Sequence, residues 1–172
     1  MKKLLYLSLL LPLLFSSCTK EEGCTDPIAT NYNGDAEEDD GSCTFGIIGV
    51  WNPYEVEVEA NVTTTMSGLT LSSFDTSYTQ TALDAGIEGN IEFTNSGTVI
   101  TTNAMGVLET DNYTTAGNTL TITNSDDGET DNATFTVTKT NLSFTISDTE
   151  IDDAMGVTTT STYDMTINST RQ

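Results

Sequence analysis

The strongest constraint in this sequence is a two-residue alternation of apolar and polar side chains in the region 44–172. In residues 54–62, Tyr, Val, Val, Ala and Val at the even positions alternate with Glu, Glu, Glu and Asn at the odd positions. The same period returns in residues 119–123, 134–138, 142–147 and 163–168. Strict alternation over four or more residues predicts β-strands that bury one face, and threonine on the other face suits a strand.

Short turn sequences separate these strands. They are Asn95-Ser96-Gly97, Ala116-Gly117-Asn118, Asp126-Asp127-Gly128 and Lys139-Thr140-Asn141. Consecutive hairpins predict an all-β fold, an antiparallel up-and-down meander that closes into a barrel, with a β-sandwich as the alternative. Residues 75–89 interrupt the alternation, and we expect a loop or one helical turn there.

The composition excludes several functions. The formal net charge is −21, and no Lys or Arg lies between Glu21 and Thr138. Nucleic acid is therefore not an expected partner, because it requires clustered cations. The chain contains no His, which excludes Ser-His-Asp and Cys-His nucleophile pairs and His-based metal sites. Carboxylates still permit glycoside hydrolysis, but 26 acidic residues make suitable pairs inevitable. We therefore expect a protein that is not an enzyme.

The N-terminus has the features of an export signal. Met1-Lys2-Lys3 precedes an apolar run from Leu4 to Phe15, which is shorter than the roughly 20 residues that a membrane-spanning helix needs. Ser16-Ser17-Cys18 follows. This arrangement resembles a bacterial lipoprotein signal, which implies that residues 1–17 are removed and that Cys18 carries a lipid anchor in the membrane. The alternative is an ordinary secretory signal that leaves Cys18 free.

Residues 18–23 are interpreted as a lipidated tether. Lys20-Glu21-Glu22 resembles the short signal that sends some Gram-negative lipoproteins to the outer face of the outer membrane. We therefore expect an outer membrane lipoprotein that is exposed at the cell surface. The alternative interpretation is a soluble spacer.

Residues 24–43 form a Cys-bracketed acidic module that has too few apolar side chains to bury a core. A segment of this kind needs a covalent link. A disulfide between Cys24 and Cys43 would contribute roughly 3 kcal/mol through loop closure in an oxidising compartment. The module resembles a repeat of bacterial surface proteins with the pattern Cys, Asp-Pro, Ala, Asn-Tyr, Ala and Asp-Asp-Gly-Ser-Cys. The matching residues are Cys24, Asp26, Pro27, Ala29, Asn31, Tyr32, Ala36, Asp39, Asp40, Gly41, Ser42 and Cys43.

Oxygen-bearing side chains in this module suggest a calcium site, because Ca²⁺ takes six to eight oxygen ligands. The candidates are Asp26, Asn31, Asn33, Asp35, Asp39 and Asp40. The alternative is a solvated acidic loop, and no other cofactor is expected.

Residues 44–172 resemble a bacterial lipocalin-like domain. The resemblance rests on "IIGVWNPYEVEVE", which contains Gly49-Val50-Trp51, on "IEFTNSGTVITT", and on "YTTAGNTLTIT" followed by "ATFTVTKTNLSFTISD". It implies that Trp51 packs at the closed end of the barrel, and that Arg171, from beyond the last strand, lies over the indole ring.

Three functions remain open from the sequence. The first is a surface lipoprotein whose lipocalin-like barrel binds a small apolar or neutral ligand, since barrels of about eight strands can hold one. The second is a structural or interaction lipoprotein with a filled barrel. The third is a carboxylate-dependent carbohydrate-active protein, which the single Trp makes the least favoured.

The lipidation of Cys18 can be tested directly. We expect Cys18→Ser to leave an unprocessed precursor and to abolish the incorporation of radiolabelled palmitate, because the thiol is the acceptor of the lipid. Gel mobility and autoradiography measure both effects. Normal processing of the mutant would show that the signal is an ordinary secretory one.

Overall fold

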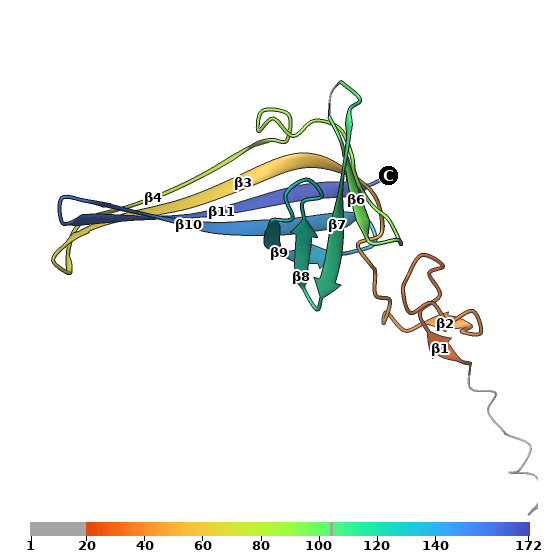
Figure 1. Cartoon of the computed structure of the whole chain (residues 1–172). Helices are drawn as coiled ribbons and strands as arrows, with labels where there is room; N and C mark the ends of the chain where they lie inside the picture. The colour runs from red at the N-terminus through yellow and green to blue at the C-terminus, as the bar shows by residue number, and fades with distance from the viewer. Residues whose placement is uncertain (1–19, 104) are drawn as a thin grey trace, which may run out of the picture. The chain divides into compact units, whose positions relative to one another are not determined.

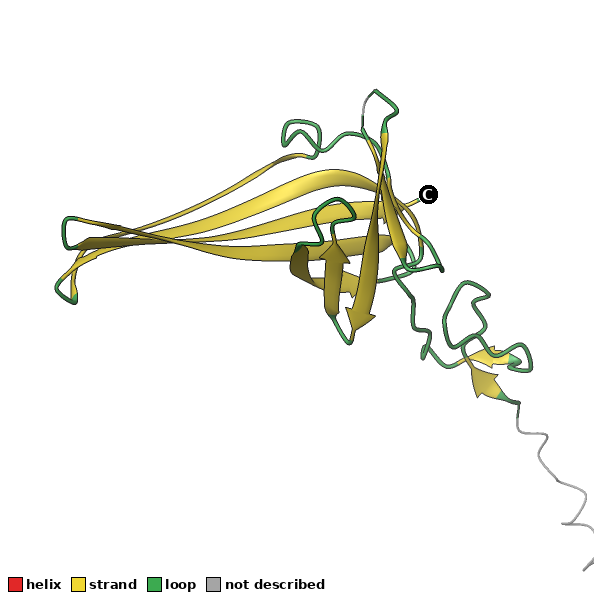
Figure 2. Cartoon of the chain, viewed as in Figure 1, coloured by secondary structure: helices red, strands yellow, loops and turns green. Residues whose placement is uncertain are grey.

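The computed structural model describes residues 20–103 and 105–172, so the predicted signal peptide (1–17) and Cys18 lie outside the described residues. No described residue is helical, and accordingly the described ranges hold no apolar helix of membrane-spanning length. The chain divides into two compact units, with the boundary between Thr44 and Phe45 (Figures 1 and 2). This boundary lies one residue beyond the predicted end of the acidic module.

The N-terminal unit contains two short strands. β1 (Glu22–Gly23) pairs in parallel with β2 (Glu38–Asp39). Lys20 Nζ lies 3.6 Å from Glu38 Oε2. Residues 20–23, which belong to the predicted tether, therefore contact the acidic module itself.

The C-terminal unit is a closed antiparallel barrel, which confirms the predicted fold over the β-sandwich. Within the described residues, eight strands form its wall, and one further strand, β4 (Leu69–Thr81), pairs with β3 alone. The wall consists of β3 (Gly49–Met66), β5 (Ile91–Phe93), β6 (Thr98–Thr102), β7 (Leu108–Ala116), β8 (Thr119–Thr123), β9 (Thr130–Val137), β10 (Asn141–Ala154) and β11 (Val157–Arg171). Neighbours pair in this order, and β11 returns to β3 to close the ring.

Alternating side chains of these strands fill the barrel. Leu120 and Leu142 are fully buried, as are Trp51 and Val56, while their polar neighbours face outward. Phe93 packs edge-on against Tyr113, with ring centroids 5.0 Å apart, a favourable aromatic geometry. The buried residues form one cluster with members from every strand of the wall except β7, whose partly buried Tyr113 packs against it. Apolar burial of this cluster is the main stabilising term of the fold.

Four strands continue past the end of the barrel and form a thin sheet. The pairing of β9 with β10 extends only over Leu142–Ile146 of β10, and the pairing of β5 with β3 extends only over Gly49–Trp51 of β3. Beyond those pairings β10, β11, β3 and β4 extend together, as Figure 1 shows. We call this sheet the blade (residues 58–66, 69–80, 147–154 and 157–165). Within the described residues neither face of the blade is covered by another layer.

Two-residue turns close both tips of the blade. Ser67-Gly68 joins β3 to β4, and Met155-Gly156 joins β10 to β11. All four residues have positive φ, between 50° and 81°, as type I′ hairpin turns require. These turns match the right-handed twist of the long strands, so each hairpin continues to its tip without splaying.

The expectation of a loop or helical turn in residues 75–89 is wrong for its first half, because residues 75–81 belong to β4. The strand was not recognisable because β4 carries Ser and Thr on both faces, and its exposed side chains show no alternation. The remaining residues, 82–90, form the connection to β5.

Core packing predicts a contrast between two leucines. Leu120 is fully buried and Leu69 is 69% exposed. We expect Leu120→Ala to lower the free energy of unfolding by about 2–5 kcal/mol, since it leaves a cavity, and Leu69→Ala to change it by less than about 0.5 kcal/mol. Chemical denaturation measures both values. Equal effects of the two substitutions would contradict the packing described here.

Candidate functional site

Trp51 and Arg171 meet at one end of the barrel. The Trp51 side chain is fully buried, and its Nε1 donates to the carbonyl oxygen of Ile47 over 2.7 Å. The Arg171 guanidinium carbon lies 4.2 Å from the centroid of the indole ring. This is the contact that the lipocalin-like resemblance implied. A cation over a desolvated indole contributes about 2 kcal/mol.

Three backbone carbonyls hold the guanidinium in place. Nε donates to Lys139 (3.0 Å), Nη1 to Ile48 (2.9 Å) and Nη2 to Gly46 (2.9 Å). Partial burial lowers the pKa of Arg171 from its ordinary value. The indole face and the carbonyl dipoles offset the loss of hydration, because all of them interact favourably with positive charge.

Gly49 is required for this arrangement. A Cβ at this position would lie 2.8 Å from Arg171 Nη1, and the φ angle of Gly49 is +139°. Both facts disfavour any other residue. Gly49, Trp51 and Arg171 therefore act together as a structural lock that closes this end of the barrel.

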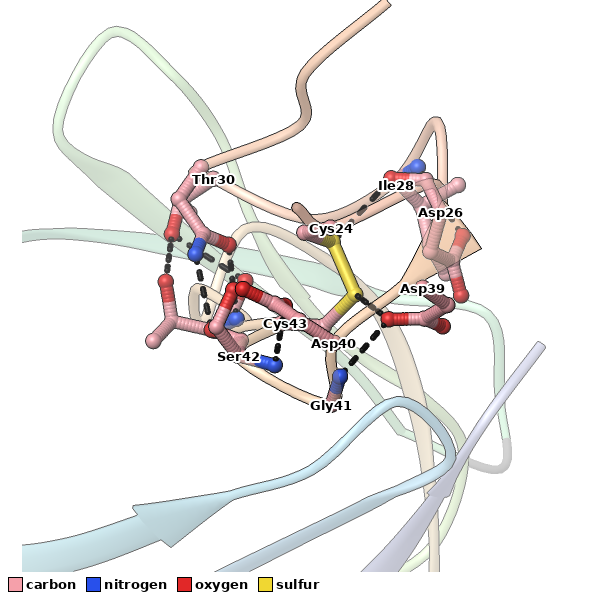
Figure 3. Close-up of a disulfide and its surroundings, with 11 residues drawn as sticks. Cys24, Asp26, Ile28, Thr30, Asp39, Asp40, Gly41, Ser42 and Cys43 are labelled. Carbon is pink, nitrogen blue, oxygen red and sulfur yellow. Dashed lines mark hydrogen bonds between the residues drawn. A yellow bond between two sulfur atoms is a disulfide. The ribbon is translucent and has the colours of Figure 1, made fainter. Parts of the chain in front are cut away.

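The N-terminal unit is held by the predicted disulfide, which is confirmed. Cys24 and Cys43 are bonded, with their Cα atoms 4.8 Å apart (Figure 3). Asn31 supports the same closure, because its Nδ2 donates to Ser42 O (2.7 Å) and its Oδ1 accepts from Thr44 N (2.8 Å). Cys24 is almost completely buried. The disulfide and these hydrogen bonds replace the core that the unit lacks.

The predicted calcium ligands mostly bind nearby backbone N–H groups. Oδ1 atoms of Asp26, Asn33, Asp39 and Asp40 each accept from the N–H two residues later, at 2.8–3.2 Å. The hydroxyl and backbone of Ser42 also lower the pKa of Asp40. Such contacts stabilise turns.

No group of three or more His, Cys, Asp or Glu side chains suited to a metal ion occurs among residues 20–103 and 105–172. Asp35 is exposed and contributes its backbone N–H, not its carboxylate, to the contact with Asn33. The structure does not bring the six proposed ligands together, and the calcium site stays a prediction.

One face of the blade carries a row of apolar side chains, which we call the blade strip: Val58, Val62, Phe74, Tyr78, Tyr163 and Met165. Val58 and Met165 are partly buried against the core, and the three aromatic residues are exposed. Register places these residues on the same face as Val56 and Ile167, which point into the barrel. Phe74 is 63% exposed, Tyr78 52% and Tyr163 39%. The strip is thus a continuation of the core that lies open to solvent.

The opposite face of the blade is polar and acidic. An open groove of about 400 Å³ lies there, lined by Glu59, Asn61, Asp75, Ser77, Thr162 and Asp164. Asn61 donates a hydrogen bond to Asp75. Glu59 stands directly opposite Asp164, and like charges in such a pair are destabilising. The blade therefore has two chemically different faces.

Apolar side chains pack the interior of the barrel. Phe93, Leu120 and Leu142 leave at most 1% of their surfaces exposed inside it. A cavity of about 220 Å³ is lined by residues 86–91 and 101–103, by Val107 and by Glu109. The filled interior favours a site outside the barrel.

Comparison of the chain with protein-family models, with curated proteins and with solved structures gives no match.

The lock predicts a response in the fluorescence of Trp51. Arg171→Ala should shift its emission to longer wavelength and increase acrylamide quenching, because the indole loses its cover. The loss of charge-assisted hydrogen bonds should cost about 2–3 kcal/mol of stability. Gly49→Ala should act in the same direction by displacing Nη1.

Gly68→Ala is the matched control for Gly49→Ala. Gly68 also has a positive φ (79°), but a Cβ added there would meet no atom within 4 Å. Its substitution should leave the Trp51 emission unchanged. An unchanged emission in Arg171→Ala would show that the guanidinium does not shield the ring.

Proposed function

We propose that the chain is an exported lipoprotein, anchored in the outer membrane through Cys18 and exposed at the cell surface, whose lipocalin-like barrel presents a binding site for a small apolar or neutral ligand. The signal-like N-terminus supports export. The disulfide between Cys24 and Cys43 supports an oxidising compartment, since disulfides are rare where thiols are kept reduced.

The single observation that carries the binding function is the blade strip. Phe74, Tyr78 and Tyr163 lie on one face and remain between 39% and 63% exposed. Contiguous exposed apolar surface on a soluble domain commonly marks a binding site. Aromatic side chains are well suited to this role, since they offer large contact areas at a low entropic cost. The strip therefore provides a binding surface that the filled barrel does not.

Charge defines the ligand class. The blade contains no Lys or Arg, so an anionic ligand would find no counter-charge there. Asp148 stands opposite Tyr163, and Glu150 opposite Ser161, on the neighbouring strand β10. These carboxylates can accept hydrogen bonds from hydroxyl or amide donors. The ligand that fits is neutral, with an apolar face for the rings and donors at one side.

A structural lipoprotein with a filled barrel is the second candidate. The packed interior around Leu120 and Leu142 favours it, because such a barrel needs no ligand to be stable. The two candidates differ in whether the strip makes a functional contact.

Binding of a neutral apolar dye, Nile red, tests the proposal. We expect the full chain to bind the dye with increased fluorescence, and Tyr163→Ala to weaken binding by about tenfold, equivalent to about 1.4 kcal/mol. Tyr32→Ala is the matched control, because Tyr32 is 49% exposed and belongs to the N-terminal unit. Native mass spectrometry of protein from its own host should show a co-purifying neutral molecule that Tyr163→Ala loses.

Dye binding that is unaffected by Tyr163→Ala, together with no co-purifying molecule, would favour the structural candidate. Equal losses in Tyr163→Ala and Tyr32→Ala would show that the dye does not report on the strip.

A further inference from the structure

No strand among residues 20–103 and 105–172 pairs with the outer edge of β4. Within the described residues β4 pairs with β3 alone. Ala82 N donates to Tyr54 O over 3.1 Å. By the alternation of an antiparallel ladder, the even-numbered residues of β4 bond to β3, and the backbone groups of Ser73, Asp75, Ser77 and Thr79 point away from it. This edge therefore presents a row of free donors and acceptors to another strand.

The two edges of the blade differ in charge. The free part of β10 carries Asp148, Glu150, Asp152 and Asp153, and charged side chains protect an edge from pairing. In contrast, Asp75 is the one charged residue between Glu59 and Asp84. β4 is also long for an edge strand, with 13 residues. One edge is thus protected, whereas the other retains the features of a pairing edge.

We propose that β4 pairs in antiparallel orientation with β4 of a second copy of this chain, which joins the two blades into one continuous sheet. A two-fold axis relates the copies, so the same edge serves both partners. Every outward N–H and C=O in the overlap then gains a bonding partner. The net charge of −21 makes two copies repel each other over most of their surfaces. The copies are therefore expected to meet at β4, because this edge carries little charge.

Side-chain pairing selects the register. An axis at Asp75 would place the two Asp75 carboxylates opposite each other, which is destabilising. An axis at Ser77 would place Phe74 opposite the partner's Gln80. An axis at Thr76 places Asp75 opposite the partner's Ser77 and Phe74 opposite the partner's Tyr78. That register forms two aromatic cross-strand pairs at the closely spaced, non-hydrogen-bonded positions.

Cysteine cross-linking tests this register in the full chain. In the proposed dimer Thr76 faces its own copy with Cα atoms about 4.5 Å apart, within the disulfide range of about 4.4–6.8 Å. We expect Thr76→Cys, expressed in intact cells and treated with a mild oxidant, to give a dimer band on a non-reducing gel. The unmodified chain should give none, because Cys24 and Cys43 are bonded to each other and, under the proposed function on which this control rests, the lipid occupies the thiol of Cys18.

Thr79→Cys is the matched control, since Thr79 is also an exposed Thr on β4. In the proposed register it faces the partner's Ser73, so the two substituted side chains of this variant lie roughly 20 Å apart, and no band should form. The Thr76→Cys band should also strengthen as salt rises from about 0.01 to 0.15 M, because salt screens the repulsion between the acidic copies.

Each result decides the proposal. A band from Thr76→Cys alone that strengthens with salt supports it. No band, equal bands from both variants, or a band from Thr79→Cys alone would overturn it, as would a Thr76→Cys band that weakens with salt.

Discussion

The antiparallel pairing of β11 with β3 supports both parts of the C-terminal unit. At one end it places Arg171 opposite Trp51, and at the other it places Val157 opposite Met66. The first part of this ladder closes the barrel, and the second forms the centre of the blade. Because side chains alternate between faces along both strands, Val56 and Ile167 enter the core while Val58 and Met165 continue onto the blade strip. Core and candidate site therefore share one ladder.

Charge is distributed unevenly over this framework. Described cations are confined to Lys20, Lys139 and Arg171, and Arg171 is engaged by carbonyls and an indole ring rather than by a carboxylate. Carboxylates therefore find few counter-charges. Amides partly replace them: Asn168 donates to both Glu55 (3.3 Å) and Glu57 (3.2 Å). Such a surface repels other copies of the chain, and of the two edge strands of the blade β4 carries less charge than β10.

Much of the fold could be predicted from local patterns. Strands such as β8 and β10 were recognisable because Leu120 and Ile122, or Leu142 and Phe144, alternate with Ser and Thr. The disulfide followed from a core-poor segment between two cysteines, and the Trp51–Arg171 contact was implied by the family resemblance. β4 was missed, because a strand with two solvent-exposed faces carries no hydrophobic period. The Asp and Asn oxygens proposed for calcium take part in local turns, and the calcium site stays a prediction.

Hydrophobic period, turn residues and cysteine spacing are local properties, and the sequence by itself determined them: an all-β chain with hairpins and a covalently closed acidic module. The length of the strands beyond the barrel depends on which partners they find, and only the tertiary structure decided it. β3 continues past β5 because β4 and β11 supply its hydrogen bonds there. The blade strip exists for the same reason, since its apolar residues lie where the ladder continues but the opposite wall of the barrel has ended.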